Sequence, residues 1–213
     1  MNNVIGIAAS LGFIVLVLVL SIFMQRFGKE VSRKFVHIAL CNIWFFYLAL
    51  VDNVYAAIIL PILFVIINSL SYKFNLIKSM EREEKDSLGT VYYAISILVI
   101  TIFTYVINKP IVGLLGLLIM GYGDGFAAVV GQKVKSKKFK IGKSTKSIAG
   151  SITMFLISLV LSLLVFYFAG TEMFILKAIG ISALATIIEI ISVKGLDNLT
   201  VPILVTILTY FAM

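Results

Sequence analysis

Two carboxylates lie inside stretches of the sequence that are otherwise almost uncharged. Asp124 sits between two glycines in residues 121–125, and Glu189 follows Ser182 and Thr186 on one face of a predicted helix. A carboxylate within a membrane span is energetically costly and usually functional. The functional interpretation of such a group is that it binds a cation or transfers a proton.

Each carboxylate also has a structural interpretation. Asp124 can pair with a lysine while Gly121 and Gly125 make a close helix contact, and Glu189 can belong to a stripe of interhelical hydrogen bonds. We favour a functional role for Asp124. For Glu189 the two interpretations stay open.

A third carboxylate, Asp197, precedes the last apolar stretch. In the residues that follow, Asn198 or Thr200 is a predicted helix N-cap, with Pro202 in the first turn. Capping does not explain Asp197 equally well. The structural alternative for Asp197 is a solvated carboxylate in a turn.

Basic residues precede or separate these stretches. Arg33 and His37 share a helix face, with Lys34 beside them, so they can clamp a phosphate. Residues 132–147 contain seven lysines and can hold a polyphosphate, although a solvated loop explains 133–140 equally simply. The segment around Lys143 is not a P-loop, because Lys137 stands where that motif requires glycine.

Composition indicates the elements that must position these groups. Hydrophobic residues make up 61% of the 213 positions and charged residues 13%, which excludes an ordinary soluble domain. A lone cysteine, Cys41, excludes a disulfide framework and is expected to pack in the interior. The net charge of +8 is attributed to membrane topology, and no nucleic acid partner is expected.

The predicted fold is all-α: one polytopic integral membrane domain, residues 1–213, with about eight transmembrane helices. The last span is short. The predicted spans are residues 4–24, 36–51, 54–71, 88–107, 111–130, 148–169, 173–193 and 200–213.

The basic residues predict the orientation of these spans. With the N-terminus outside, the cytosolic connections carry 4, 4, 7 and 1 Lys or Arg, and only Lys109 and Lys177 lie on the outer side. Both termini are therefore expected outside a prokaryotic cell membrane, with the active site at the cytosolic end. The even-numbered spans begin there, and helix N-termini favour phosphate.

Several short motifs, in order along most of the chain, resemble the CTP-dependent lipid-alcohol kinases, which include phytol kinase, dolichol kinase and a CTP-dependent diacylglycerol kinase. These kinases are similar in turn to phosphatidate cytidylyltransferases. Asp197 is followed by Asn198-Leu199-Thr200 without a second acidic residue, which favours the kinases. The motifs are residues 33–37, 89–93, 123–128 with Gly131, 146–151 and 189–202.

The resemblance implies Mg²⁺ held by Asp124 and Asp197, with CTP as phosphoryl donor. The predicted catalytic residues are Asp124 and a base that removes the hydroxyl proton. Glu189 is the first candidate for this base, because desolvation would raise its pKa, and His37 is the second. The candidate nucleotide-binding residues are Arg33, Lys34, Gly131, Lys143, Lys146, Ser147, Gly150, Asn198 and Thr200.

The expected reaction is transfer of a γ-phosphoryl group from a nucleoside triphosphate to a membrane lipid alcohol such as phytol, a polyprenol or diacylglycerol. The alternative enzyme is a CTP:phosphatidate cytidylyltransferase, and the non-enzymatic alternative is a transporter, since buried carboxylates also mark ion paths. A homo-oligomer stays open.

Overall fold

The computed structural model describes residues 2–74, 88–142 and 144–213. Within these ranges, seven helical stretches are long and apolar enough to cross a membrane, and α11 is a shorter apolar helix. The prediction of an all-α polytopic membrane protein is confirmed. The α-helices are α1 (Asn3–Met24), α2 (Lys29–Leu40), α3 (Ile43–Leu50), α4 (Val54–Ala57), α5 (Ile59–Phe74), α6 (Gly89–Val106), α7 (Ile111–Leu118), α8 (Gly125–Lys133), α9 (Ile148–Phe168), α10 (Phe174–Ile191) and α11 (Asp197–Ala212).

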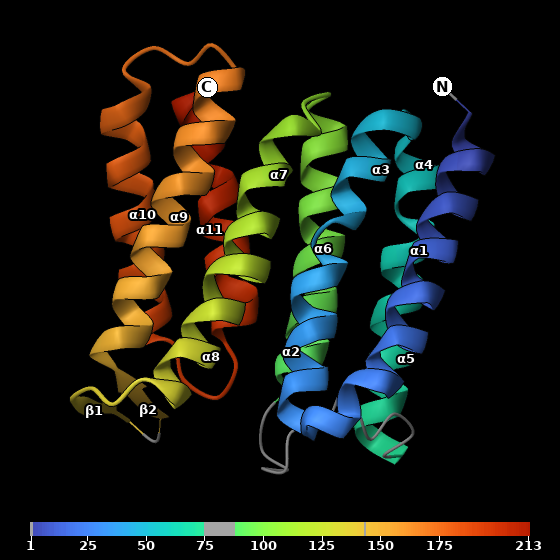
Figure 1. Ribbon diagram of the computed structural model, residues 1–213. Coiled ribbons are helices and arrows are strands. Elements are labelled where there is room, and N and C mark those ends of the chain that lie inside the picture. The colour runs from blue at the N-terminus through green and yellow to red at the C-terminus, as the bar shows by residue number, and fades with distance from the viewer. Residues whose placement is uncertain (1, 75–87, 143) are drawn as a thin grey trace.

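The helices run along one common direction in two groups, with α1 to α6 on one side and α7 to α11 on the other (Figure 1). Both chain termini lie at one end of the bundle. The opposite end carries the strands β1 (Lys138–Ile141) and β2 (Ser144–Ser147) and the starts of α2, α9 and α11.

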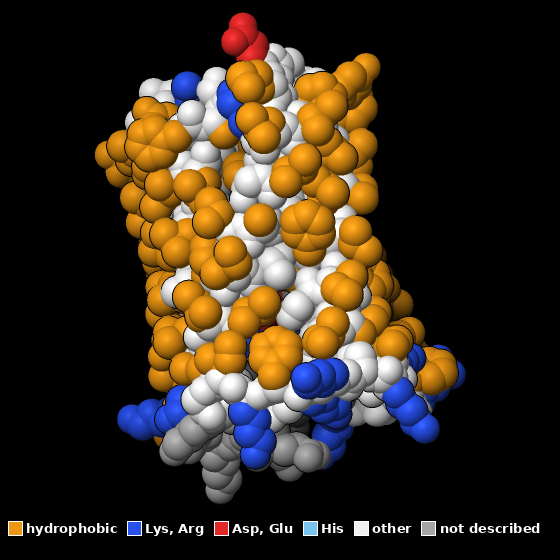
Figure 2. Space-filling view, turned by 90° about the vertical axis from the view of Figure 1, so that its left-hand side faces the viewer, with side chains coloured by type: hydrophobic (Ala, Val, Ile, Leu, Met, Phe, Trp, Pro, Cys, Tyr) orange, Lys and Arg blue, Asp and Glu red, His pale blue; other side chains and the backbone are white. Residues whose placement is uncertain are grey.

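Side chains sort along this axis as a bilayer requires. Figure 2 shows a broad hydrophobic band on one face, with Lys and Arg gathered along the end that carries the strands. Exposed apolar residues in this region include Leu156, Val160 and Leu164 of α9, between 49% and 57% exposed. Such side chains are stable against lipid rather than water.

Two helix starts differ from the predictions. α2 begins at Lys29 rather than residue 36, because its charged residues share an amphipathic helix that buries Ser32, Lys34, Val36 and Leu40. Arg33, Lys34 and His37 therefore lie within the helix and not at its entrance.

α11 begins at Asp197, and the prediction that Asn198 or Thr200 caps it is wrong. The N-cap position is Leu196, which makes no side-chain capping bond. Thr200 instead donates its hydroxyl to the Leu196 carbonyl, 2.9 Å away, inside the first turn.

The lysine-rich connection is partly ordered as an antiparallel hairpin rather than a solvated loop throughout. Phe139 pairs with Lys146 across the strands, so both lie on one face of the hairpin. Lys138 and Lys140 alternate with Phe139 and are exposed. The strands thus place Lys146 on a different face of the hairpin from the exposed Lys138 and Lys140.

A π-helical turn, η2 (Ile119–Asp124), joins α7 to α8 and contains the first intramembrane carboxylate. π-helical turns are rare and frequently occur at functional sites. Close packing surrounds it: a Cβ on Gly121 would lie 2.4 Å from the sulfur of Cys41, and one on Gly125 would lie 2.4 Å from Ile38. Cys41 is buried, as predicted, and the proposed small-residue contact of Gly121 and Gly125 is present.

Candidate active site

Three carboxylates from distant parts of the chain meet near the hairpin end of the bundle. Asp124 ends η2, Glu189 lies near the end of α10, and Asp197 begins α11. One oxygen from each lies within 4.8 Å of the others, and all three residues are 5–7% exposed. We call these residues the carboxylate cluster.

Asp124 is paired with α2. The Nζ of Lys34 donates to its Oδ2 at 2.9 Å, and the Nε2 of His37 lies 3.5 Å from the same oxygen. His37 Nε2 is also 3.1 Å from the carbonyl oxygen of Met120, to which only a protonated nitrogen can donate. Pairing of Asp124 with a lysine, the structural alternative from the sequence, is therefore present, and it joins the second span to the fifth.

Lys146 connects the other two members. Its Nζ donates to Glu189 and lies 3.4 Å from Oδ2 of Asp197. Burial alone lowers the pKa of this amine, but the charges of Glu189 and Asp197 outweigh it and hold the pKa of Lys146 above its ordinary value. The ammonium form therefore persists at neutral pH.

The hairpin and α9 position this lysine. Ser147 follows it directly and caps α9, its hydroxyl accepting a hydrogen bond from the amide of Gly150 at 3.1 Å. A Cβ on Gly131 would lie 2.6 Å from the Ser147 oxygen, so α8 and the start of α9 require a glycine there. Gly131, Ser147 and Gly150 thus have packing and capping roles, and their nucleotide-binding role stays a prediction.

Residues between α10 and α11 place Asp197. Lys194 and Gly195 adopt left-handed backbone conformations, with φ of 54° and 83°, which turn the chain sharply after α10.

Ser182 and Glu189 of the predicted polar stripe are buried, and Thr186 is half-buried. The stripe faces the interior, as expected.

The remaining candidates lie at varying positions around the cluster. Arg33 makes two hydrogen bonds to Glu30, of 2.5 and 2.9 Å, and Thr200 lies 3.0 Å from the hydroxyl of Ser192. Asn198 is 5% exposed, and its side-chain oxygen has no partner among the described residues. Lys143 lies outside the described residues.

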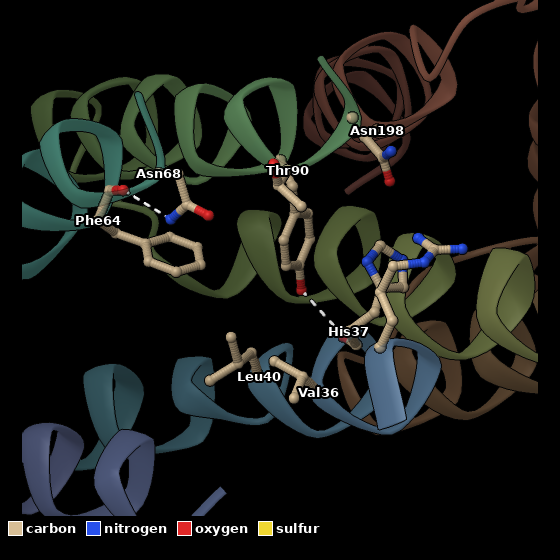
Figure 3. Close-up of a pocket in the computed structure, with 10 residues that line it drawn as sticks. Val36, His37, Leu40, Phe64, Asn68, Thr90 and Asn198 are labelled. Carbon is tan, nitrogen blue, oxygen red and sulfur yellow. Dashed lines mark hydrogen bonds between the residues drawn. The ribbon is translucent and has the colours of Figure 1, made fainter. Parts of the chain in front are cut away.

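A cavity opens beside the cluster, between α2, α5, α6 and α11 (Figure 3). Its empty volume is about 380 Å³, including space open to solvent. His37 and Asn198 lie at one end, and Phe64 and Asn68 lie at the other. We call it the polar cavity; its polar lining residues are Arg33, His37, Asn68, Thr90, Tyr93 and Asn198.

Sequence reasoning missed Asn68 as a lining residue, while the motif at residues 89–93 pointed to Thr90 and Tyr93. The Tyr93 hydroxyl donates to the carbonyl of His37 at 3.3 Å, and the two rings lie 4.6 Å apart. Asn68 donates to the carbonyl of Phe64 at 2.7 Å. The sequence signal that could have identified Asn68 is a single asparagine within an apolar span.

Together the fold and site define a multi-pass membrane protein with a buried cluster of carboxylates and lysines at one end of its helices. The chain is 33% identical over 210 residues to the phytol kinase of Synechocystis sp., covering 93% of this chain and 87% of that relative. It is 32% identical to probable phytol kinase 1, chloroplastic, of Oryza sativa subsp. japonica (85% of this chain, 64% of the relative). It is 28% identical to phytol kinase 1, chloroplastic, of Arabidopsis thaliana (86% and 67%).

The chain therefore belongs to the phytol kinase family. The resemblance to lipid-alcohol kinases inferred from the motifs is confirmed. No family model and no solved structure match the chain.

Proposed function

We propose that this protein is a kinase that transfers the γ-phosphoryl group of CTP to the hydroxyl of a membrane lipid alcohol. Membership in the phytol kinase family supports the kinase class, and the names of the relatives make phytol the first alcohol to test. Polyprenols, including dolichol, and diacylglycerol are the next alcohols to test. The choice of CTP rests on the motif resemblance alone.

The observation that carries the proposal is the carboxylate cluster beside a polar cavity, with buried Lys34 and half-buried Lys146 paired to it. Phosphoryl transfer needs mainly positioning and neutralisation of phosphate charge. Lys34 and Lys146 supply cations within the cluster, and Arg33 lines the cavity beside it. A nucleotide from water and a lipid from the bilayer can both reach this end of the helices.

The cluster fits Mg²⁺ by its chemistry. Oxygen ligands at 2.0–2.1 Å from one Mg²⁺ lie up to about 4.2 Å apart. The carboxylate oxygens of the cluster lie within 4.8 Å of one another, which is close to that spacing. Asp124 and Asp197 are the first ligands we propose, and the geometry adds Glu189 as a third. When bound, Mg²⁺ neutralises charge on the transferred phosphate.

Groups for the triphosphate surround the cluster. Lys146 and Lys34 can move from carboxylate to phosphate oxygens. The first-turn amides of α9 and α11 already hydrogen-bond within the protein, so these helix starts contribute the positive ends of their dipoles. Ser147 and Gly150 begin α9, and Asn198 and Thr200 begin α11. These positions keep their proposed nucleotide-binding role.

In the proposed step, the lipid oxygen forms a bond to the γ-phosphorus while the bond from that phosphorus to the β–γ bridging oxygen breaks, releasing CDP. The hydroxyl proton passes to a base. Glu189 is ion-paired with Lys146, whereas His37 lines the cavity beside Asp124. We favour His37, because its Nδ1 carries a lone pair that can accept a proton when Nε2 holds the hydrogen donated to Met120.

We also propose that the cluster faces the cytosol and that both termini lie outside. The hairpin end carries the start of α2 and the lysine-rich connection, and the termini lie at the other end. The positive-inside rule supports this direction.

Labelled nucleotide tests the proposal. Purified protein in detergent is incubated with Mg²⁺, each alcohol, and CTP labelled at the α- or γ-phosphate, with ATP in parallel. A γ-label in the lipid supports the kinase. An α-label together with cytidine in the product of phosphatidate would instead identify a cytidylyltransferase, and flux through proteoliposomes without nucleotide would revive the transporter.

A further inference from the structure

A second cavity adjoins the polar cavity, on the side of the apolar part of the bundle. It lies between α1, α2, α3, α5 and α6 and has an empty volume of about 390 Å³, including space open to its surroundings. We call it the apolar groove. Its lining residues include Leu40, Trp44, Tyr47, Leu60, Phe64 and Ile97.

The groove presents hydrocarbon despite its two polar aromatic residues. The indole nitrogen of Trp44 donates to the carbonyl of Pro110 at 2.9 Å, and the hydroxyl of Tyr47 donates to the carbonyl of Ala57 at 2.9 Å. Both polar groups are therefore satisfied by backbone, and the two buried aromatic rings give the groove an apolar back wall.

The groove and the polar cavity share two lining residues, Leu40 and Phe64. At the far end of the polar cavity, His37 lies 3.5 Å from the Asp124 carboxylate. Asn198, beside Asp197, offers a buried side-chain oxygen that has no partner within the described parts of the chain. The two cavities thus adjoin at Leu40 and Phe64, with an apolar wall on one side and an unsatisfied acceptor beside the carboxylate cluster on the other.

The direction of this path matches a lipid lying in one leaflet. His37 and Leu40 on α2 and Trp44 and Tyr47 on α3 follow one another along the helix direction. From His37 to Tyr47 the rise is about 15 Å at 1.5 Å per residue. A ligand along this wall has its polar end at the hairpin end of the bundle.

We infer that the apolar groove binds the hydrocarbon chain of the lipid alcohol and that the polar cavity receives its hydroxyl, which donates to the Asn198 side-chain oxygen on binding and turns to His37 when its proton is transferred. The Asn198 side chain then belongs to the acceptor site, and the nucleotide uses only the backbone at the start of α11. This inference rests on the proposed function and adds where the acceptor binds. It places the hydrocarbon chain of the lipid between α1, α2, α3, α5 and α6. The nucleotide then approaches from the side of Lys146 and α9.

Photo-crosslinking tests the location directly. A long-chain primary alcohol with a diazirine at the tip of its chain is added to the full-length protein in detergent, irradiated, and mapped by peptide mass spectrometry. Labels are expected in peptides containing Trp44 and Tyr47 or Leu60 and Phe64, and excess phytol should compete. Labels confined to outward-facing residues such as Leu156 and Val160 would overturn the groove assignment.

Substitution at the junction of the two cavities gives a kinetic test. Leu40→Trp is expected to raise KM for the long-chain alcohol about tenfold or more, which corresponds to about 1.4 kcal/mol, whereas KM for a short soluble alcohol should rise by a much smaller factor. Leu159→Trp on α9 is the matched control, because Leu159 is half-buried and lines neither cavity. Equal loss with both alcohols in Leu40→Trp would contradict the assignment.

Failure of the inference is distinguishable from failure of the proposed function. If the wild type phosphorylates the alcohol but the diazirine labels only other surfaces, the groove assignment alone is wrong. If the wild type phosphorylates no alcohol with any triphosphate, the proposed function is wrong, and the acceptor assignment goes with it.

Discussion

Lys34 and Asp124, 90 residues apart in the chain, form a buried ion pair with 2.9 Å between Nζ and Oδ2. The pair joins α2 to the π-helical turn η2. α2 lines the polar cavity, and η2 carries one member of the carboxylate cluster. Its two partners have different expected contributions to folding and to activity.

Asp124→Asn leaves Lys34 buried without a counter-charge, and breaking a buried pair in this way typically costs about 3–5 kcal/mol. We expect reduced thermal stability in detergent and a loss of turnover of about 100-fold or more. The double variant Lys34→Met with Asp124→Asn should recover thermal stability but not turnover. Recovery of turnover in the double variant would show that Asp124 serves folding alone.

Removal of divalent metal should abolish phosphoryl transfer, because the triphosphate charge would no longer be neutralised. Activity is measured after treatment with a chelator and again after addition of Mg²⁺. Asp197→Asn should raise the Mg²⁺ concentration that gives half-maximal activity about 10–100-fold. Glu172→Gln is the control, since this exposed carboxylate lies in the connection between α9 and α10. An unchanged Mg²⁺ requirement in Asp197→Asn would exclude Asp197 as a ligand.

Lys146→Met should remove the ammonium that lies between Glu189 and Asp197, leaving two close carboxylates without a shared cation. We expect a raised KM for the nucleotide and a lower kcat, with partial rescue in Lys146→Arg. Lys138→Met on the exposed face of the same hairpin should behave as wild type. Equal effects of Lys138→Met and Lys146→Met would indicate that only the net charge of the hairpin matters.

Gly131→Ala separates packing from nucleotide binding. Its new Cβ would lie 2.6 Å from the Ser147 oxygen and displace the cap of α9, so thermal stability should fall. The expected loss is about 1 kcal/mol, the usual contribution of such a cap. Gly180→Ala meets nothing within 4 Å and is the control. A Gly131→Ala protein of full stability that no longer binds nucleotide would assign the glycine to nucleotide contact instead.

Membrane orientation is open to cysteine labelling in intact cells. Because Cys41 is buried, the wild type should react little with a membrane-impermeant maleimide. Glu172→Cys should be labelled from outside, whereas Lys138→Cys should be labelled only after the membrane is permeabilised. The reverse pattern would place the carboxylate cluster on the outer side.

Hydrophobicity in the sequence was enough to predict the spans. Spans such as residues 148–169 are single apolar runs, and α9 occupies nearly the same range. Charge at the ends is less informative: α2 begins seven residues before its predicted start, because its polar residues face other helices instead of water. The hairpin lacks a long apolar alternation and could not be recognised in the same way.

Residue type and position in the sequence were enough to mark Asp124 and Glu189 as candidates, because a charged group in an apolar span stands out whatever surrounds it. Asp197 lies between two spans, and the motif resemblance made it a candidate metal ligand. Only the tertiary structure decided their partners: Lys34 for Asp124, and Lys146 for Glu189 and Asp197. The cavities were likewise decided by packing, since Leu40, Phe64 and Ile97 come from three helices. Contacts between distant segments depend on how helices pack, and a one-dimensional pattern of hydrophobicity and charge does not encode that packing directly.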